Sequence, residues 1–214
     1  MNQYVDYFIA NEFDIEDGFK LRNVLIRPLR PTDFSQWLDV RTYSHDWLVK
    51  WEPRVPAGRY PELTERAFLS RLAMMKRERQ IGSSFGFGVF FNDHFIGEVN
   101  LSNIQRGAMQ SGTIGYWIDR RFCGRGFIPE ATTGVLRFAF EMLNLHRVEI
   151  LIVPTNKSSL RVVEKLDLRY EGITKDYLMI DGIWCDHARF SVLNTDWQAK
   201  SGFYERFLVS IDQR

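Results

Sequence analysis

Helical and extended hydrophobic patterns alternate along this chain. Apolar residues recur at the spacing of one helix face in 62–79, 129–140 and 156–166. Short runs rich in β-branched and aromatic residues predict strands at 24–29, 84–91, 94–104, 113–118, 148–153, 170–177 and 184–193. The mixture predicts an α/β chain of the mixed α+β kind, in which helices cover a central sheet.

Turn residues indicate how the strands connect. The pairs Asn92-Asp93 and Asp181-Gly182 each lie between two predicted strands, where such pairs favour tight hairpins. The run 148–153 is continuously apolar, which favours burial on both faces of a sheet. We therefore expect a mixed, mostly antiparallel central sheet with flanking helices.

The segment ahead of the first long helix is less regular. A short helix is expected to open at Thr32-Asp33, with the aspartate in its first turn. Residues 47–60 are rich in Trp, Pro and Gly and predict an ordered loop. Large aromatic side chains in such a loop are candidate substrate contacts. The alternative is that Trp47 and Trp51 only plug the edge of the core.

The composition is that of an ordinary globular protein. The chain has 214 residues, 45% hydrophobic and 26% charged, which suits one domain with a sizeable core. We expect that domain at 21–197, preceded by an extension at 1–20 and followed by a tail at 198–214. The choice between monomer and homodimer stays open.

Charge and cysteine content argue against several partners. The 28 basic and 27 acidic residues give a formal charge of +1, so no strong field favours nucleic acid or an anionic membrane. No apolar run approaches the ~20 residues that span a bilayer, and no basic stretch precedes an apolar core at the start. We expect a cytoplasmic protein. The 2 cysteines and 4 histidines show no ligand spacing, so no metal is expected.

A glycine loop carries the strongest chemical signal. Residues 121–126 read Arg-Phe-Cys-Gly-Arg-Gly, between the strand at 113–118 and the helix at 129–140. Closely spaced glycines let backbone N–H groups converge, and a helix amino terminus adds partial positive charge, so the loop suits a phosphorylated ligand. It lacks the Gly-Lys-Ser/Thr of a nucleotide hydrolase and the third glycine of a dinucleotide fingerprint. The alternative is a sharp structural turn.

This loop resembles the Gln/Arg-x-x-Gly-x-Gly/Ala loop of the GNAT superfamily of acyltransferases. Further motifs, in the same order along the chain, are similar to the branch of RimJ/RimL-like ribosomal-protein-alanine N-acetyltransferases. They are Gly-Glu-Val-Asn-Leu at 97–101, Leu-His-Arg-Val at 145–148, Pro-x-Asn-x-x-Ser at 154–159 and Val-Val-Glu-Lys-Leu at 162–166. The resemblance implies the GNAT fold, with splayed central strands, and acetyl-CoA as cosubstrate.

The resemblance also implies which residues hold the cofactor. Backbone amides of the loop would bind the pyrophosphate, with Arg121 and Arg125 near it to neutralise charge. The backbone of Ile118 would bind the pantetheine arm, and Asn156 would contact that arm, although an asparagine there is also a good helix N-cap. The implied loop residues are Phe122, Cys123, Gly124, Arg125, Gly126 and Phe127.

Two departures from the family pattern bear on mechanism. Many relatives place a tyrosine, the acid for the departing thiolate, where this chain has Val163. The resemblance then implies Ser159 as the donor to the thiolate, and the alternative is a serine that bonds its own helix backbone. In Leu166-Asp167-Leu168 an aspartate stands where relatives usually have glycine, so we expect local strain or a longer turn.

Direct attack of an amine in a ternary complex is the expected reaction. Cys123 has no paired histidine in the sequence, which argues against a covalent intermediate. An α-amine is roughly 10 to 15% neutral at pH 7 and a lysine only about 0.04%, a gap of about 3 kcal/mol. One carboxylate acting through water could therefore serve an α-amine. Strand alternation turns Glu98 and Asn100 away from the core, so Glu98 is the candidate base; the alternative is a solvated strand glutamate.

The acceptor is expected between the 47–60 loop and the last hairpin. We expect N-acetylation of the amino terminus of a protein or peptide, with a ribosomal protein as a possible partner. Acetylation of a small amine, of polyamine or aminoglycoside type, is the near alternative. A regulatory module that binds CoA without turnover is the alternative of another class. The candidate acceptor contacts are Trp51, Glu52, Asn100, Tyr116, Trp184 and Asp186.

Overall fold

The computed structural model of the chain describes residues 15–53 and 62–208. In this part of the chain one 8-stranded sheet has the order β1-β2-β3-β4-β5-β6-β8-β7. Every neighbouring pair is antiparallel except β5 and β6, so the predicted mixed, mostly antiparallel sheet is confirmed. The strands are β1 (Phe19–Lys20), β2 (Leu25–Arg27), β3 (Phe85–Phe91), β4 (His94–Gln105), β5 (Ser111–Ile118), β6 (Arg147–Ile152), β7 (Arg169–Ile180) and β8 (Ile183–Leu193).

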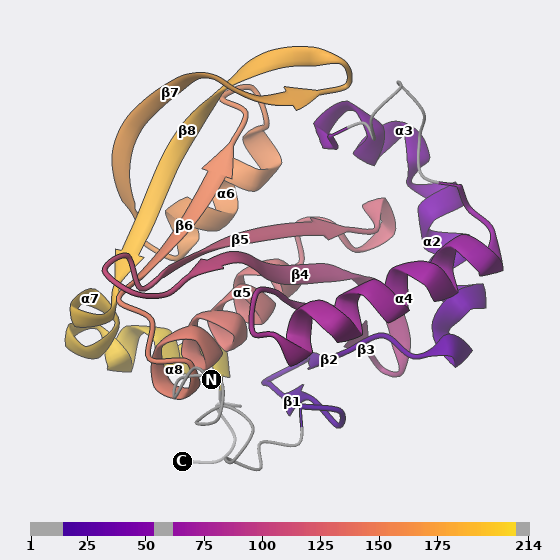
Figure 1. Cartoon of the computed structure of the whole chain (residues 1–214), viewed down its shortest axis with the longest axis horizontal. Coiled ribbons are helices and arrows are strands. Elements are labelled where there is room, and N and C mark those ends of the chain that lie inside the picture. Colours follow the sequence, from indigo (N-terminus) through magenta and orange to yellow (C-terminus); the bar gives the residue numbers. More distant parts are fainter. Residues whose placement is uncertain (1–14, 54–61, 209–214) are drawn as a thin grey trace.

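The two central strands separate part of the way along their length. β5 and β6 pair only from Ser111↔Arg147 to Thr113↔Glu149. Beyond that point β5 stays with β4 and β6 stays with β8, so the sheet opens into a V between them (Figure 1). The expected splayed central strands are thus present, and the opening exposes backbone of both strands to a ligand.

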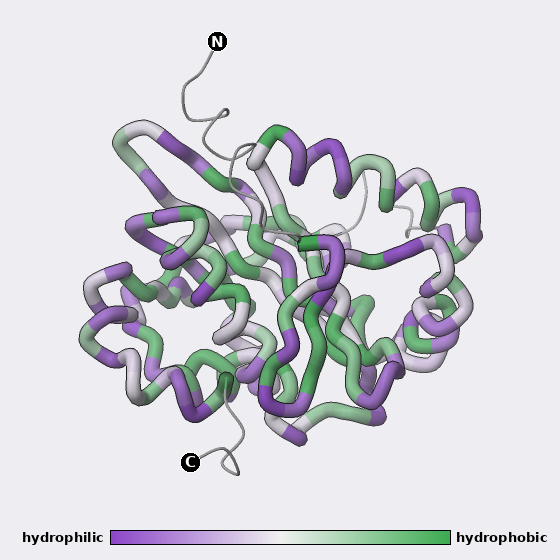
Figure 2. Tube along the Cα trace, turned by 90° about the horizontal axis from the view of Figure 1, so that it is seen from below, coloured by the Kyte–Doolittle hydropathy of each residue, from purple (hydrophilic) through white to green (hydrophobic). Residues whose placement is uncertain are grey.

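Helices cover both faces of the sheet. α5 and α8 pack into the main core together with the inner residues of β3 to β6. α2 and α4 pack on the opposite face in a second cluster around Phe68. Hydrophobic and hydrophilic positions alternate along the outer helices, as in amphipathic helices with one side against the sheet (Figure 2). The α-helices are α2 (Phe34–Tyr43), α3 (His45–Leu48), α4 (Glu65–Gln80), α5 (Phe127–Arg137), α6 (Lys157–Lys165), α7 (Asn194–Ala199) and α8 (Ser201–Leu208).

Short helical turns complete the architecture. Within the part of the chain that the structure describes, three are 3-10 helices: η1 (Pro31–Asp33), η2 (Val49–Trp51) and η3 (Arg120–Phe122). The fourth, η4 (Phe138–Met142), is a π-helical turn that continues α5.

Several expected boundaries shift in the structure. Within 47–53 the chain forms the end of α3 and η2 rather than a loop, and 54–61 lies outside the described residues. β1 lies inside the expected extension and pairs with β2. α8 lies inside the expected tail, where Tyr204 is 1% exposed and joins the main core. The residues against which α8 packs are remote in sequence. The apolar spacing of residues 198–214 therefore does not by itself predict that this segment joins the main core.

The turn after α6 shows how aspartate replaces the usual glycine. Asp167 adopts the left-handed conformation with φ +52°, and the Leu168 N–H donates to the Val163 carbonyl at 3.1 Å. This closes the helix as a glycine would, so the turn is not lengthened. The Asp167 carboxylate also accepts a hydrogen bond from Lys200 Nζ at 2.7 Å, which ties α6 to the end of α7.

An ion-pair cluster lies at the base of the V. Arg147 on β6 donates to Glu171 on β7 at 2.9 Å and to Glu149 at 2.7 Å, and Ser191 Oγ on β8 donates to Glu171 at 2.7 Å. The hydrogen bond from Arg147 lowers the pKa of Glu171 to about 2, against the opposing effect of partial burial. When folding depresses the pKa of a carboxyl group, the group stabilises the fold at pH values above its ordinary pKa. This stabilisation is lost as the pH falls through the depressed pKa.

Glu171→Gln is therefore expected to lower the free energy of unfolding by about 1 kcal/mol at neutral pH. The ordinary pKa of this carboxyl group is 4.5. As the pH falls from that value to about 2, the parent should lose this stabilisation, whereas the variant should not. Urea denaturation at neutral and acidic pH measures both. Glu164→Gln, at an exposed α6 position, is the control. Equal pH dependence in parent and Glu171→Gln would contradict the assignment.

Candidate functional site

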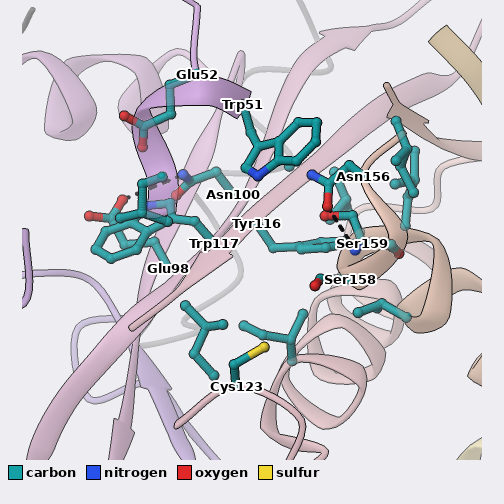
Figure 3. Close-up of a pocket in the computed structure, with 18 of the residues that line it drawn as sticks. Trp51, Glu52, Glu98, Asn100, Tyr116, Trp117, Cys123, Asn156, Ser158 and Ser159 are labelled. Carbon is teal, nitrogen blue, oxygen red and sulfur yellow. Dashed lines mark hydrogen bonds between the residues drawn. The ribbon is translucent and has the colours of Figure 1, made fainter. Parts of the chain in front are cut away.

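One cavity of about 720 Å³ fills the opening of the V (Figure 3). The glycine loop and one face of α6 line one side of it. Side chains of β4, β5, η2 and the helices α2 and α4 line the other. A single space therefore joins the loop expected to bind phosphate to the aromatic segment expected to bind an acceptor.

The glycine loop has the backbone conformation that its sequence predicts. Gly124 has φ +83° and Gly126 has φ +91°, and Gly126 is the N-cap of α5. A Cβ at either position would meet no protein atom within 4 Å. The glycines are thus required by backbone conformation, and the space beside them is left open. Five loop residues line the cavity: Phe122, Cys123, Gly124, Gly126 and Phe127.

The two arginines of the loop contact other side chains of the protein. Arg121 donates to Asp119 at 2.7 Å and to Asp39 at 2.6 Å, and these hydrogen bonds raise its pKa. Two carboxylates therefore already neutralise its charge. Arg125 lies over the Phe122 ring at 5.2 Å. Neither arginine lines the cavity.

Asp119 instead anchors the loop from beneath. Its carboxylate, 0% exposed, accepts hydrogen bonds from Ser44 Oγ at 3.0 Å and from the Arg121 N–H at 2.9 Å. Ser44 Oγ in turn accepts from the Arg120 N–H at 3.0 Å. This anchor was not predicted from the sequence, although an aspartate directly after a strand and before a glycine loop was the available signal.

The first turn of α6 presents polar groups to the cavity. Asn156 caps the helix by accepting the Ser159 N–H at 3.2 Å, and its side chain also lines the cavity (Figure 3). Capping and a ligand contact are thus compatible. Ser158 and Ser159 both line the cavity. Val163 is 0% exposed and packs into the main core.

A tyrosine connects the two arms of the V. Tyr116 on β5 donates its hydroxyl proton to the Ser159 backbone carbonyl at 2.9 Å (Figure 3). Burial raises the pKa of Tyr116, so the group remains a neutral donor at physiological pH. Because β5 and β6 are unpaired here, this hydrogen bond is a direct link across the opening.

Glu98 is buried rather than solvated. Its residue is 0% exposed, and Arg71 on α4 donates to both carboxylate oxygens, one contact being 3.1 Å. Burial lowers the pKa of Arg71, but the charge of Glu98 and the hydrogen bonds to it raise the pKa by more. The expected turn away from the main core is present, since Glu98 faces α4 and the cavity. Both carboxylate oxygens of Glu98 are thus engaged by the Arg71 guanidinium.

The remaining acceptor candidates divide into two groups. Trp51, Glu52, Asn100 and Tyr116 line the cavity, and Glu52 is held by Arg41 through hydrogen bonds of 2.5 and 2.7 Å. Trp184 and Asp186 do not line it: Trp184 is 57% exposed and Asp186 pairs with Lys175.

The last hairpin still reaches the cavity in another way. The Asp181 N–H at its tip donates to the Glu52 carbonyl at 3.3 Å, and Pro53 pairs with Ile180. His187, further along β8, lines the cavity and was missed from the sequence. The hairpin therefore bounds the acceptor side without presenting Trp184 to it.

Metal-binding clusters and membrane-spanning helices are both absent from residues 15–53 and 62–208. These ranges hold no group of three or more His, Cys, Asp or Glu residues that could bind a metal. Among the helices they contain, none is long and apolar enough to cross a membrane.

The fold and the cavity match one family. Residues 23–169 match the acetyltransferase (GNAT) domain, and the chain belongs to this family of N-acetyltransferases. It is 33% identical to the probable N-acetyltransferase YjcK of Bacillus subtilis, over 83% of this chain and 97% of that protein. It is 32% identical to the [ribosomal protein uS5]-alanine N-acetyltransferase of Escherichia coli, over 81% of this chain and 89% of that one.

A solved structure shows the same architecture. Mycobacterium smegmatis RimJ in complex with CoA-disulfide superposes with a TM-score of 0.75 at 26% identity, covering 85% of this chain and 92% of that one.

Proposed function

We propose that this protein transfers the acetyl group of acetyl-CoA to the N-terminal α-amine of a protein, with a ribosomal protein as the leading candidate. The observation that carries the proposal is the continuity of the cavity. It runs from the glycine loop and α6 to a chamber lined by Trp51, Glu52 and Asn100, so a cofactor and an acceptor can meet inside it. The name of the Escherichia coli relative, a [ribosomal protein uS5]-alanine N-acetyltransferase, supports this choice of acceptor.

The chemistry needs little from the protein beyond placement. An α-amine with a pKa of about 8 is partly neutral at physiological pH, so attack on the thioester can begin without a strong base. In the resulting step the amine nitrogen bonds to the acetyl carbon, the carbon–sulfur bond breaks, and the amine proton passes to water. Because Arg71 holds Glu98, we assign Glu98 to shaping the chamber rather than to taking that proton directly.

Ser159 is the proposed donor to the departing thiolate. Ser159→Ala is expected to lower turnover roughly ten- to a hundredfold, because one hydrogen bond to developing charge contributes about 1 to 3 kcal/mol. Cofactor dissociation should change little, since the charge develops only in the transition state. Steady-state kinetics and a direct binding measurement test this.

Ser158→Ala is the matched comparison, because Ser158 also lines the cavity one residue earlier. It should leave turnover at the parental level. Parental turnover in both variants would remove Ser159 from the thiolate role. If Ser159→Ala weakened CoA binding as much as it slowed turnover, the hydroxyl would be a cofactor contact instead.

A mixed acceptor assay tests the function itself. The purified protein is incubated with acetyl-CoA and peptides that begin with Ala, Ser or Met, together with lysine peptides, polyamines and aminoglycosides. Mass spectrometry is expected to find the acetyl group on a peptide α-amine, preferentially in the peptides that begin with Ala or Ser. Modification of a small amine alone would support the alternative acetyltransferase. CoA binding without transfer to any amine would support a regulatory module.

A further inference from the structure

One face of α6 borders the cavity along the whole helix. Ser158, Arg161, Val162 and Lys165 all line it, at the spacing i, i+3, i+4 and i+7 of a single helix face. Leu160 and Val163 pack against the main core, and Val162 packs against it as well as lining the cavity. Two long cationic side chains are therefore presented to the same space as the glycine loop.

Arg161 and Lys165 differ in their pairing from Arg41 and Arg71, which also line the cavity. Arg41 is paired with Glu52, and Arg71 with Glu98. Arg161 and Lys165 are exposed and have no carboxylate partner within the described ranges. The cavity wall formed by α6 thus carries positive charge that the protein itself leaves uncompensated, as a site for an anion would.

The proposed cofactor supplies a matching group. Besides the pyrophosphate, CoA carries a phosphomonoester on its ribose, and a phosphomonoester has a charge of about −1.5 to −2 at neutral pH. Ser159 and Asn156 lie at the amino end of α6, where the thioester arm is proposed to lie. Lys165 is six residues beyond Ser159, roughly 9 Å further along the helix axis. Arg161 and Lys165 thus line the same cavity as the glycine loop, further along α6 than Asn156 and Ser159.

We propose that Arg161 and Lys165 form a subsite for the ribose 3′-phosphate of CoA. The inference rests on the proposed use of acetyl-CoA and adds a specificity: the protein should prefer CoA to 3′-dephospho-CoA. It also accounts for Arg121, whose two carboxylate partners leave it unsuited to neutralising phosphate. The helix thereby supplies cationic charge that Arg121 does not.

Calorimetric titration with CoA and with 3′-dephospho-CoA tests the subsite without any acceptor amine. Arg161→Gln and Lys165→Gln are each expected to weaken CoA binding roughly fivefold and the double variant roughly twentyfold, the scale of exposed ion pairs. Binding of 3′-dephospho-CoA should be nearly unchanged. The CoA preference of the parent should shrink as salt concentration rises.

Lys157→Gln is the matched control, because Lys157 is an exposed cation on the same helix that does not line the cavity. It should retain the parental preference. Equal affinity of the parent for both ligands, or an equal loss for both in the double variant, would overturn the subsite. Such results leave acetyl transfer itself intact, whereas absence of transfer to any amine with the CoA preference preserved would defeat only the proposed function.

Discussion

Gly126→Val is expected to weaken CoA binding about a hundredfold, because two charge-assisted hydrogen bonds from the loop would be lost or misaligned. Gly126 has φ +91°, a conformation that a β-branched residue avoids at a cost of roughly 1 to 2 kcal/mol. The loop must change its backbone to accept valine, and its N–H groups then no longer converge. The added side chain would also enter the open space beside the loop.

Gly107→Val provides a control with the same backbone strain. Gly107 has φ +67° in the turn between β4 and β5, has open space around its Cβ position, and does not line the cavity. It should lose similar stability and keep parental CoA affinity. Calorimetry with CoA, together with thermal unfolding, separates the two effects. A folded Gly126→Val protein with parental affinity would falsify the assignment of the loop to the pyrophosphate.

Arg71→Met is expected to destabilise the protein by about 3 kcal/mol, since breaking a buried ion pair leaves an uncompensated charge. Glu98 is 0% exposed, and its hydrogen bonds to Arg71 link β4 to α4. The double variant Arg71→Met, Glu98→Gln should recover most of the loss because the buried charge is then gone. Urea denaturation of the parent, Arg71→Met, Glu98→Gln and the double variant gives the coupling energy.

The same pair tests how Glu98 contributes to activity. If it shapes the chamber, Glu98→Gln should reduce turnover by a factor that does not vary with pH. A base would give a deficit that grows at low pH, where more of the amine is protonated. Turnover measured across the pH range decides between them, and a growing deficit at low pH would return Glu98 to the base role.

Local sequence signals predicted strands β2 to β8, helices α4 to α6 and the backbone conformation of the glycine loop. Asn92-Asp93 and Asp181-Gly182 do form hairpin turns, and all four residues have positive φ. Gly124 and Gly126 have the conformation that the loop motif requires. These features depend on a few neighbouring residues, so the sequence pattern alone identifies them.

Features that depend on remote partners were predicted poorly. The alternation of β4 placed Glu98 on the correct face, but Arg71, 27 residues away, makes it a buried ion pair. Arg121 belongs to the loop motif, yet Asp39, 82 residues away, occupies it. Trp184 is a large aromatic residue of the kind that often contacts substrates, but it lies outside the cavity.

For this protein the sequence by itself determined strands β2 to β8, helices α4 to α6, the positive-φ glycines of the loop and the family to which the motifs point. The tertiary structure alone decided which charged side chains are engaged in ion pairs and which face the cavity without a carboxylate partner among the described residues. Folding pairs Arg121 and Arg71 with carboxylates and leaves Arg161 and Lys165 facing the cavity. The hydrogen-bond partners and the burial of an arginine depend on residues that are remote in sequence. Arginines of the same chain therefore acquire different roles only after the chain has folded.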